Sequence, residues 1–360
     1  MQHVPAKKSK HDSHRTWRIP SRMCPIGEGH RRVPCCAVRW LPALIILGFL
    51  VWSYHVFVYQ ICIKKVSDYL TIGLLLFFYH LLLFMFLWTW FRCIFVAPVR
   101  IPDQWKISPE DVDKLKRNDG IEGASRVLNY AARNLPIATC TIDGLVRYCK
   151  TCWIIKPDRA HHCRTCHMCV LKMDHHCPWI VNCVHFHNFK YFILFLFYAE
   201  VYCFYLFCVM VYDLYLICGF EVTALKNQHS WNILQYLVCI LFNIFTVIMY
   251  TVSLLNVSRN RTTMESAYAT YFLLGGKNNN GFNLGYFVNF RDLYGDKWYL
   301  WPFPIFSSRG DGFSFPLAHD RLKEVRTGNQ KKDNQPTRTQ MYKENMNRIL
   351  GIHQPPFNEE

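Results

Sequence analysis

Cysteine and histidine side chains are concentrated in one short stretch of the chain, residues 149–183. Their spacing reads CxxC, eight residues, HHC, two further cysteines at intervals of three, four residues, DHHC, five residues and a last cysteine. Thiolate and imidazole are ligands that tetrahedral zinc prefers, and CxxC pairs with histidine are how a short segment supplies them. The stretch therefore predicts metal binding. The eleven candidate ligands are Cys149, Cys152, Cys163, Cys166, Cys169, Cys177, Cys183, His161, His162, His175 and His176.

Two closed zinc sites of three cysteines and one histidine would use eight of these eleven side chains. An interleaved arrangement builds the first site from Cys149, Cys152, His162 and Cys169, and the second from Cys163, Cys166, His176 and Cys183. Cys177, His175 and His161 are then left over. Spacing alone does not distinguish this partition from its neighbours. A thiol left uncoordinated beside a spare imidazole and a carboxylate favours nucleophilic chemistry over a purely structural role.

The elements that must position this stretch are long and apolar. Of 360 residues, 51% are hydrophobic and 18% charged, which is too apolar for an ordinary soluble protein. Residues 41–62, 69–91, 191–218 and 231–256 are each long and apolar enough to cross a bilayer, which takes about 20 helical residues. We therefore expect an all-α membrane protein with four transmembrane helices and a cytosolic zinc-binding cysteine-rich domain between the second and third.

Lys and Arg outside these spans predict the orientation. The connections 63–68 and 219–230 hold only Lys64, Lys65 and Lys226, and residues 1–40, 97–190 and 257–360 hold nearly all the rest. By the positive-inside rule both termini and the middle segment, with its cysteine-rich part at 147–190, face the cytosol, and the two connections are luminal. The net charge of +16 then reflects topology, so no nucleic-acid partner is expected. Residues 257–319 are expected to be ordered and the polar tail 320–360 disordered.

Asp174, His175, His176 and Cys177 read DHHC and are followed by Pro178 and Trp179. With its four spans, the chain closely resembles the DHHC-type palmitoyltransferases, the protein S-acyltransferases, from about residue 35 to 311. The motifs are KPDRAHHC (156–163), LKMDHHCPW (171–179), RTTMES (261–266) and PIFSSRGDG (304–312). The resemblance implies the interleaved partition, two structural zinc ions, and Cys177 as the nucleophile.

The resemblance also implies a reaction. Palmitoyl-coenzyme A or another long-chain acyl-coenzyme A would acylate Cys177, and a cysteine of a cytosolic or membrane-associated protein would then take the acyl group. A cysteine near its free pKa of about 8.5 is mostly protonated, so it needs a base; His175 is the candidate, oriented by Asp174. The lipid bilayer is a further partner. The expected location is an endomembrane, Golgi or ER, or the plasma membrane.

Further residues carry over from the family. Thr262, Thr263 and Glu265 match the TTxE motif, which packs against the catalytic segment, and Asn289 is expected to contact the protein core. Lys156, Arg159 and His161 are candidates for binding the phosphates of coenzyme A. A solvated, lipid-facing basic patch is the alternative interpretation of these three.

The acyl chain needs an apolar cavity of matching depth. At about 1.5 Å per residue, Ser53 lies roughly 18 Å into the first span and Tyr202 roughly 17 Å into the third. A palmitoyl chain of about 20 Å, starting near Cys177 at the interface, would end at this level. We therefore expect Ser53 and Tyr202 to close the floor of the cavity. Trp179, Phe192 and Phe195 are expected to line its upper part.

The sequence departs from the family in four places. Residues 97–99 replace an Asp-Pro-Gly triplet, Val181 stands where Asn is common, and His185, expected to be exposed, stands where Gly is usual. Glu200, inside the third span, is expected to find a polar partner such as His55 or Gln235.

Two other functions are alternatives to acyl transfer. A catalytically silent zinc-bearing membrane adaptor would need the zinc ligands but not Cys177. A metal or small-ion transporter would rest on Glu200 and Asp213, two carboxylates on one span, which make a poor pathway for an ion.

Overall fold

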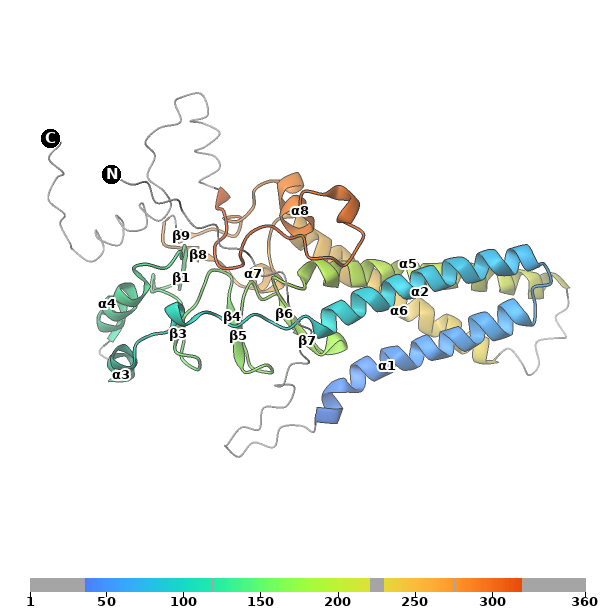
Figure 1. Cartoon of the computed structure of the whole chain (residues 1–360), viewed down its shortest axis with the longest axis horizontal. Helices are drawn as coiled ribbons and strands as arrows, with labels where there is room; N and C mark the ends of the chain where they lie inside the picture. Colours follow the sequence, from blue (N-terminus) through green and yellow to red (C-terminus); the bar gives the residue numbers. More distant parts are fainter. Residues whose placement is uncertain (1–35, 118–119, 221–229, 275, 319–360) are drawn as a thin grey trace, which may run out of the picture.

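Four long helices dominate the computed structural model, which describes residues 36–117, 120–220, 230–274 and 276–318 (Figure 1). They are α1 (Cys36–Tyr54), continued by the π-helical η1 (His55–Ile63), α2 (Tyr69–Phe95), α5 (Phe189–Phe220) and α6 (Ser230–Ser258). Each contains a stretch long and apolar enough to cross a membrane, as expected from the sequence. Helix α5 packs against both α2 and α6, so the third span is the central one.

The expectation of an all-α protein is wrong for the segments outside these helices, which contain short strands. Three two-stranded antiparallel hairpins and one three-stranded sheet of order β1-β8-β9 are present in the described residues. The hairpins are β2 (Tyr148–Cys149) with β3 (Ile154–Ile155), β4 (His161–Cys163) with β5 (Met168–Val170), and β6 (His175–Cys177) with β7 (Asn182–Val184). The sheet joins β1 (Thr139–Cys140), β8 (Tyr271–Phe272) and β9 (Gly276–Lys277). A chain that must bring ligands from distant positions to one ion reverses direction within a few residues, and hairpins provide those reversals.

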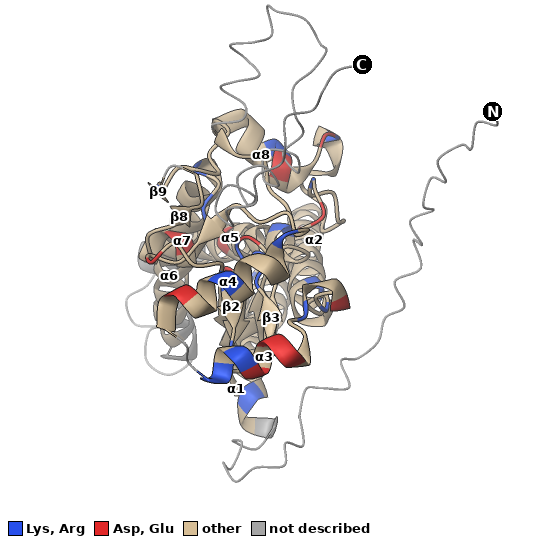
Figure 2. Cartoon of the chain, turned by 90° about the vertical axis from the view of Figure 1, so that its left-hand side faces the viewer, with Lys and Arg blue, Asp and Glu red and all other residues tan. Residues whose placement is uncertain are grey.

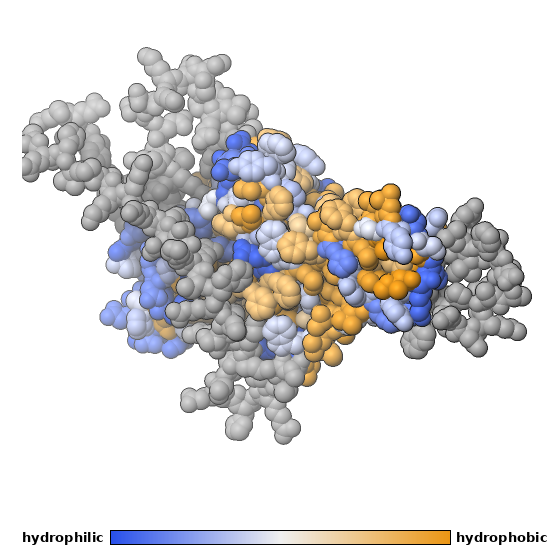
Figure 3. All heavy atoms as spheres, turned by 45° about the vertical axis from the view of Figure 1, so that its right-hand side comes forward, coloured by the Kyte–Doolittle hydropathy of each residue, from blue (hydrophilic) through white to orange (hydrophobic). Residues whose placement is uncertain are grey.

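Short helices complete the end of the molecule that carries the hairpins. They are η2 (Asp103–Trp105), α3 (Pro109–Arg117), α4 (Gly120–Ala132), η3 (Pro178–Ile180), α7 (Thr263–Ala267), α8 (Tyr286–Tyr294) and η5 (Trp298–Leu300). Figure 2 shows that the blue and red positions gather on this end. In Figure 3 an orange hydrophobic band covers the long helices. The molecule therefore has an apolar helical part and a polar part with hairpins.

The two larger apolar cores follow this division, and a small third one lies around Cys163 and Val170. The largest core lies among the long helices and includes Cys177 of β6 and Ile180 of η3. The second core contains Trp105 and packs α3 and α4 against the hairpin β2–β3. It also includes Phe282 and Phe315 from the C-terminal part of the chain. Cys177 thus lies where the hairpins meet the long helices.

Candidate active site

The first cysteine cluster combines two hairpins. Hairpin β2–β3 supplies Cys149 and Cys152, and β4–β5 places His162 opposite Cys169. The Nδ1 atom of His162 lies 3.5, 3.3 and 3.8 Å from the three sulfur atoms of Cys149, Cys152 and Cys169. Tetrahedral zinc, with Zn–S of about 2.3 Å and Zn–N of about 2.0 Å, requires S···N separations of about 3.6 Å. The four side chains therefore fit a zinc ion.

The second cluster has the same arrangement and is built from the hairpins β4–β5 and β6–β7. Register pairing on β6–β7 places His176 opposite Cys183, and Cys163 and Cys166 come from the preceding hairpin. The Nδ1 atom of His176 lies 3.7, 3.5 and 3.6 Å from the sulfur atoms of Cys163, Cys166 and Cys183. Within each cluster all four ligand atoms lie within 4.8 Å of one another. This is the interleaved grouping, and it leaves Cys177, His175 and His161 outside both clusters.

Strand alternation explains why three adjacent residues of β6 have different surroundings. Successive side chains on a strand point to opposite faces, so His176 faces its cluster while His175 and Cys177 share the other face. Cys177 is 6% exposed, and the side chain of His175 is 32% exposed. The thiol of Cys177 is close enough to the His175 imidazole to raise its pKa. The pair of a thiol and an imidazole is therefore built into one three-residue strand.

Asp174, the residue before β6, is the third member of the group with His175 and Cys177. Its Oδ2 atom lies 2.7 Å from Nδ1 of His175, and its carboxylate is 3% exposed. Burial lowers the pKa of His175, but the hydrogen bonds with Asp174 and Cys177 outweigh it and raise that pKa to about 9. This raised pKa favours a proton on His175 and a thiolate on Cys177.

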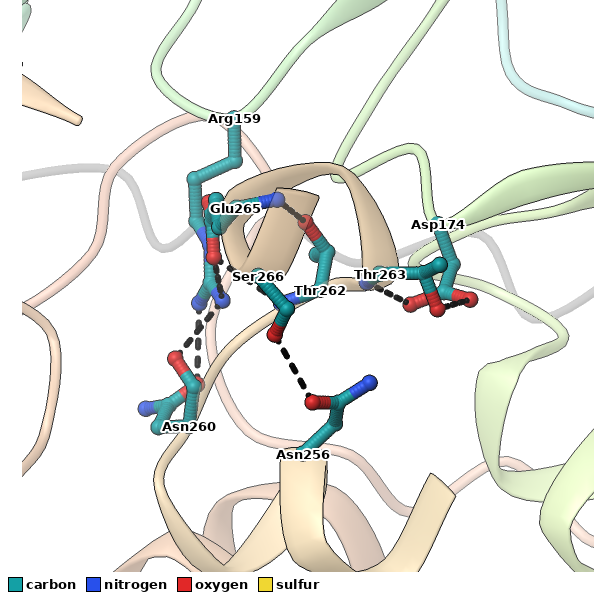
Figure 4. Close-up of polar contacts among 8 residues, drawn as sticks. All are labelled: Arg159, Asp174, Asn256, Asn260, Thr262, Thr263, Glu265 and Ser266. Carbon is teal, nitrogen blue, oxygen red and sulfur yellow. Dashed lines mark hydrogen bonds and ion pairs between the residues drawn. The ribbon is translucent and has the colours of Figure 1, made fainter. Parts of the chain in front are cut away.

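The start of α7 fixes the Asp174 carboxylate. The backbone N–H of Thr263 donates to Oδ1 of Asp174 and the Thr263 hydroxyl donates to Oδ2, both at 2.8 Å (Figure 4). Thr262 caps α7, and its hydroxyl accepts from the N–H of Glu265, whose carboxylate accepts from the N–H of Thr262 in return. The TTxE motif therefore contacts the catalytic segment directly.

Arg159 joins this network rather than a phosphate site. Its Nε and Nη2 atoms donate to the two carboxylate oxygens of Glu265 at 2.8 and 2.7 Å, and its Nη1 and Nη2 atoms donate to the side-chain and backbone oxygens of Asn260 (Figure 4). The guanidinium is 1% exposed. The expectation that Arg159 binds coenzyme A is corrected, because its donors are already used in the interior.

Lys156 and His161 are half-buried near the first cluster. Burial and the neighbouring charge of Arg147 lower the pKa of Lys156. The same two causes lower the pKa of His161 to about 3, so its imidazole is neutral at physiological pH. His161 can therefore donate a hydrogen bond but carries no positive charge.

A cavity of about 490 Å³ extends from Cys177 into the space between the long helices. Its lining includes Trp179, Phe192 and Phe195 near Cys177. At its far end Ser53 Oγ and Tyr202 Oη lie 2.7 Å apart, and the Tyr79 hydroxyl is 2.9 Å from that of Tyr202. The structure thus brings together all five residues expected along the cavity. Tyr79 was missed, because the depth of a residue along a span does not reveal which face of the helix it occupies.

Three further positions bear on the expectations from the sequence. His185 was expected to be exposed, but it is buried, with 1% of its surface exposed. Its Nδ1 atom accepts from the N–H of His187, so its Nε2 atom carries the proton and donates to the carbonyl of Val96 at 3.2 Å. Val181 adopts a left-handed backbone with φ 51°, a conformation that suits Asn better than a β-branched residue. Asn289 is 3% exposed, and its amide donates to the Ser258 carbonyl at the end of α6, as expected.

Glu200 has partners other than those expected. Its two carboxylate oxygens accept from Asn243 Nδ2 and Thr246 Oγ1, both at 3.0 Å, instead of from His55; the side chain of Gln235 lies outside the described residues. These bonds join α5 to α6, which accounts for a carboxyl group in an apolar helix.

Comparison with known proteins places these features in a family. The sequence profile of the family described as DHHC palmitoyltransferase matches residues 144–269. Palmitoyltransferase ZDHHC15 of Homo sapiens is 37% identical over 285 residues, which is 79% of this chain and 84% of that protein. Palmitoyltransferase ZDHHC20 of Bos taurus is 37% identical over 337 residues, 88% of this chain and 90% of that protein. Palmitoyltransferase ZDHHC2 of Homo sapiens is 38% identical over 306 residues, 82% and 81% of the two chains.

Proposed function

The chain belongs to the DHHC palmitoyltransferase family and is a protein S-palmitoyltransferase of the membrane, and from this premise we propose that it works through an acyl-enzyme on Cys177. A long-chain fatty acyl group moves from acyl-coenzyme A to Cys177 and then to a cysteine of a protein. The observation that carries this mechanism is the placement of Cys177 and His175 together on one strand and in the lining of an apolar cavity.

In the first half-reaction His175 takes the proton of the Cys177 thiol, and the thiolate attacks the thioester carbonyl. A bond forms between Sγ of Cys177 and the acyl carbon, and the bond from that carbon to the coenzyme A sulfur breaks. The imidazolium returns its proton to the leaving thiolate. Asp174, held by Thr263, keeps the His175 ring oriented and stabilises its charged form.

In the second half-reaction the thiol of a protein cysteine takes the place of coenzyme A. His175 accepts its proton, the new thiolate attacks the acyl carbon, and the Cys177 thiol is restored. Each half-reaction exchanges one thioester for another. The exchange is near balance in free energy, so no nucleotide has to be hydrolysed.

The acyl chain occupies the cavity between the long helices. Chain length is limited at the floor, where Ser53 and Tyr202 are hydrogen-bonded. Trp179, Phe192 and Phe195 hold the part of the chain nearest the thioester. The half-buried Lys156 and His161 contact coenzyme A outside the cavity.

The two cysteine clusters hold structural zinc ions. Each offers four ligands in a closed set, so neither leaves an open position for water or substrate. The ions fix the hairpins and, through β6, the position of Cys177. We assign the hairpins and both termini to the cytosolic side, where acyl-coenzyme A and cytosolic or membrane-associated substrates are available.

A zinc-bearing adaptor without catalytic activity is the competing function, and one variant separates the two. Purified full-length chain in lipid nanodiscs is incubated with labelled palmitoyl-coenzyme A and a protein substrate. Cys177→Ser should lose transfer to the substrate while zinc content stays at the wild-type level, because Cys177 lies outside both clusters. Transfer at the wild-type rate by Cys177→Ser would refute the acyl-enzyme mechanism.

A further inference from the structure

A second cavity, of about 830 Å³, lies on the other side of Pro178 from the acyl cavity. Its walls are the first turn of α1, the segment after α2, and the cysteine hairpins. Pro178 is the one residue that lines both cavities among those the structure describes. The groove is therefore separate from the acyl site but adjoins the catalytic segment.

The polar wall of this groove carries several basic side chains. Arg39, Arg100, Lys106 and His167 line it beside four ligands of the two cysteine clusters, and none of the described lining residues is Asp or Glu. Lys106 is paired with Asp103 at 2.8 Å. Neither Arg39 nor Arg100 has a carboxylate within 4 Å in the part of the chain that the structure describes. Two guanidinium groups are thus available to an anion.

The other wall is apolar and belongs to the ends of two spans. Val38, Trp40 and Pro42 come from the start of the first membrane helix, and Ile94 comes from the last turn of the second. Arg39 is in the first turn of its span and Arg100 follows the end of α2 by five residues. Charged and apolar walls therefore meet at the level of the headgroups, where an amphiphile changes from polar to apolar.

We propose that this groove binds an anionic phospholipid, with its phosphate between Arg39 and Arg100 and its acyl chains against Trp40, Pro42 and Ile94. Guanidinium groups bind phosphate through paired hydrogen bonds, and basic pockets between membrane helices bind anionic headgroups. The chain's own N-terminal segment is a poorer occupant. Residues 1–35 contain eight Lys or Arg and two Asp or Glu, so they carry the same sign of charge as the groove.

Native mass spectrometry of the full-length chain in detergent, with phosphatidylserine or phosphatidylcholine added, tests the proposal. Wild type should bind phosphatidylserine about tenfold or more tightly than phosphatidylcholine, and Arg39→Gln/Arg100→Gln should lose that preference. Arg117→Gln/Arg126→Gln removes the same charge from α3 and α4, outside the groove, and should keep it. Zinc content reports the fold in each variant.

A second variant keeps both arginines. Ala97 lines the groove, and Ala97→Trp should reduce phosphatidylserine binding by filling the space. Phosphatidylserine preference that persists in both the arginine pair variant and Ala97→Trp would overturn the proposal. Displacement of phosphatidylserine from wild type by soluble coenzyme A would also overturn it, since the groove would then be a site for soluble phosphates.

Discussion

At the scale of single residues, His175 has two neighbours that reach it by different routes. Cys177 is close because it is two residues along the same strand, whereas Asp174 is held in place because Thr263, 89 residues away in sequence, binds its carboxylate. The four-residue motif therefore contains the groups proposed to react, but the contact that orients them comes from tertiary structure. Loss of the Thr263 contact would leave the motif intact and its geometry unsupported.

Lys172 allows a prediction about pH. Its ammonium lies 5.7 Å from the ring centres of both Phe189 and Phe315, and burial, aided by the charge of Arg159, lowers its pKa to about 7. The folded chain then binds fewer protons than the unfolded chain between that pH and about 10.4, the pKa of a free lysine, so stability rises with pH over this window.

Lys172→Met should therefore raise the melting temperature, and the increase should be larger at about pH 6 than at about pH 9. The reason is that the charged lysine destabilises the folded state fully only below its folded pKa. Thermal unfolding of the full-length chain in detergent at the two pH values measures the effect. A decrease that is equal at both pH values would show that packing, not charge, decides the role of Lys172.

Arg159 and Glu265 form a buried ion pair that links the turn before β4 to α7 across 106 positions in sequence. Removing one partner leaves an uncompensated charge in the interior, so Glu265→Gln should reduce the free energy of unfolding by about 3 kcal/mol or more. Arg159→Met/Glu265→Met removes both charges and should recover part of that loss. A Glu265→Gln chain that unfolds with wild-type stability in the same denaturant titration would contradict this account.

Only some of the site residues and their partners could be predicted from the sequence. The eleven candidate ligands were found from residue types and spacing, which are local, but their partition into two sites and the role of Cys177 came from the family resemblance. The partners of Arg159 and His185 were not found, because they are carbonyl and carboxylate groups more than 80 positions away, Glu265 for the first and Val96 for the second. From residue type alone, Arg159 was expected to bind a phosphate group and the His185 imidazole was expected to be exposed.

At the scale of elements, the hairpins and the two clusters form one cooperative unit. Hairpin β4–β5 supplies ligands to both clusters, His162 and Cys169 to the first and Cys163 and Cys166 to the second. Strands of two or three residues have no hydrophobic period long enough to be predicted from sequence, which is why an all-α chain was expected. Their formation depends on the ligands they present.

The purified chain should contain two zinc ions, and Cys149→Ala or Cys163→Ala should lower zinc content and folded yield together, because ligand binding contributes folding free energy. Cys177→Ser is the matched control and should retain both ions, since it replaces a cysteine outside the clusters. Elemental analysis of the purified variants gives the stoichiometry. One ion per wild-type chain would show that the grouping seen in the structure does not hold two metals.

At the scale of the whole molecule, hydropathy predicted the four long helices well because each is apolar over more than its minimum length. The helical rise per residue also predicted that Ser53 and Tyr202 lie at the same depth in the membrane, and their hydroxyl groups are in contact. Depth does not reveal which face of a helix a residue occupies, so the contribution of Tyr79 on α2 could not be predicted.

The floor of the cavity should set the preferred acyl length. Tyr202→Ala removes a ring at the far end and should shift the preference to longer chains, whereas Ser53→Phe fills that end and should shift it to shorter ones. Tyr205→Ala, which removes a ring of α5 outside the cavity lining, should leave the profile unchanged. Competition among acyl-coenzyme A substrates of different length measures the profile. Active Tyr202→Ala and Ser53→Phe variants with the wild-type profile would place the floor elsewhere.

The acyl-enzyme itself is the most direct test of the mechanism. Full-length chain in nanodiscs is mixed with palmitoyl-coenzyme A in the absence of protein substrate, digested at timed intervals and mapped by mass spectrometry. We predict one hydroxylamine-sensitive palmitoyl group on Cys177, formed about 100-fold to 10,000-fold more slowly in His175→Ala, the range expected for loss of a general base. Palmitate on another cysteine with Cys177 unmodified throughout the time course would contradict the mechanism.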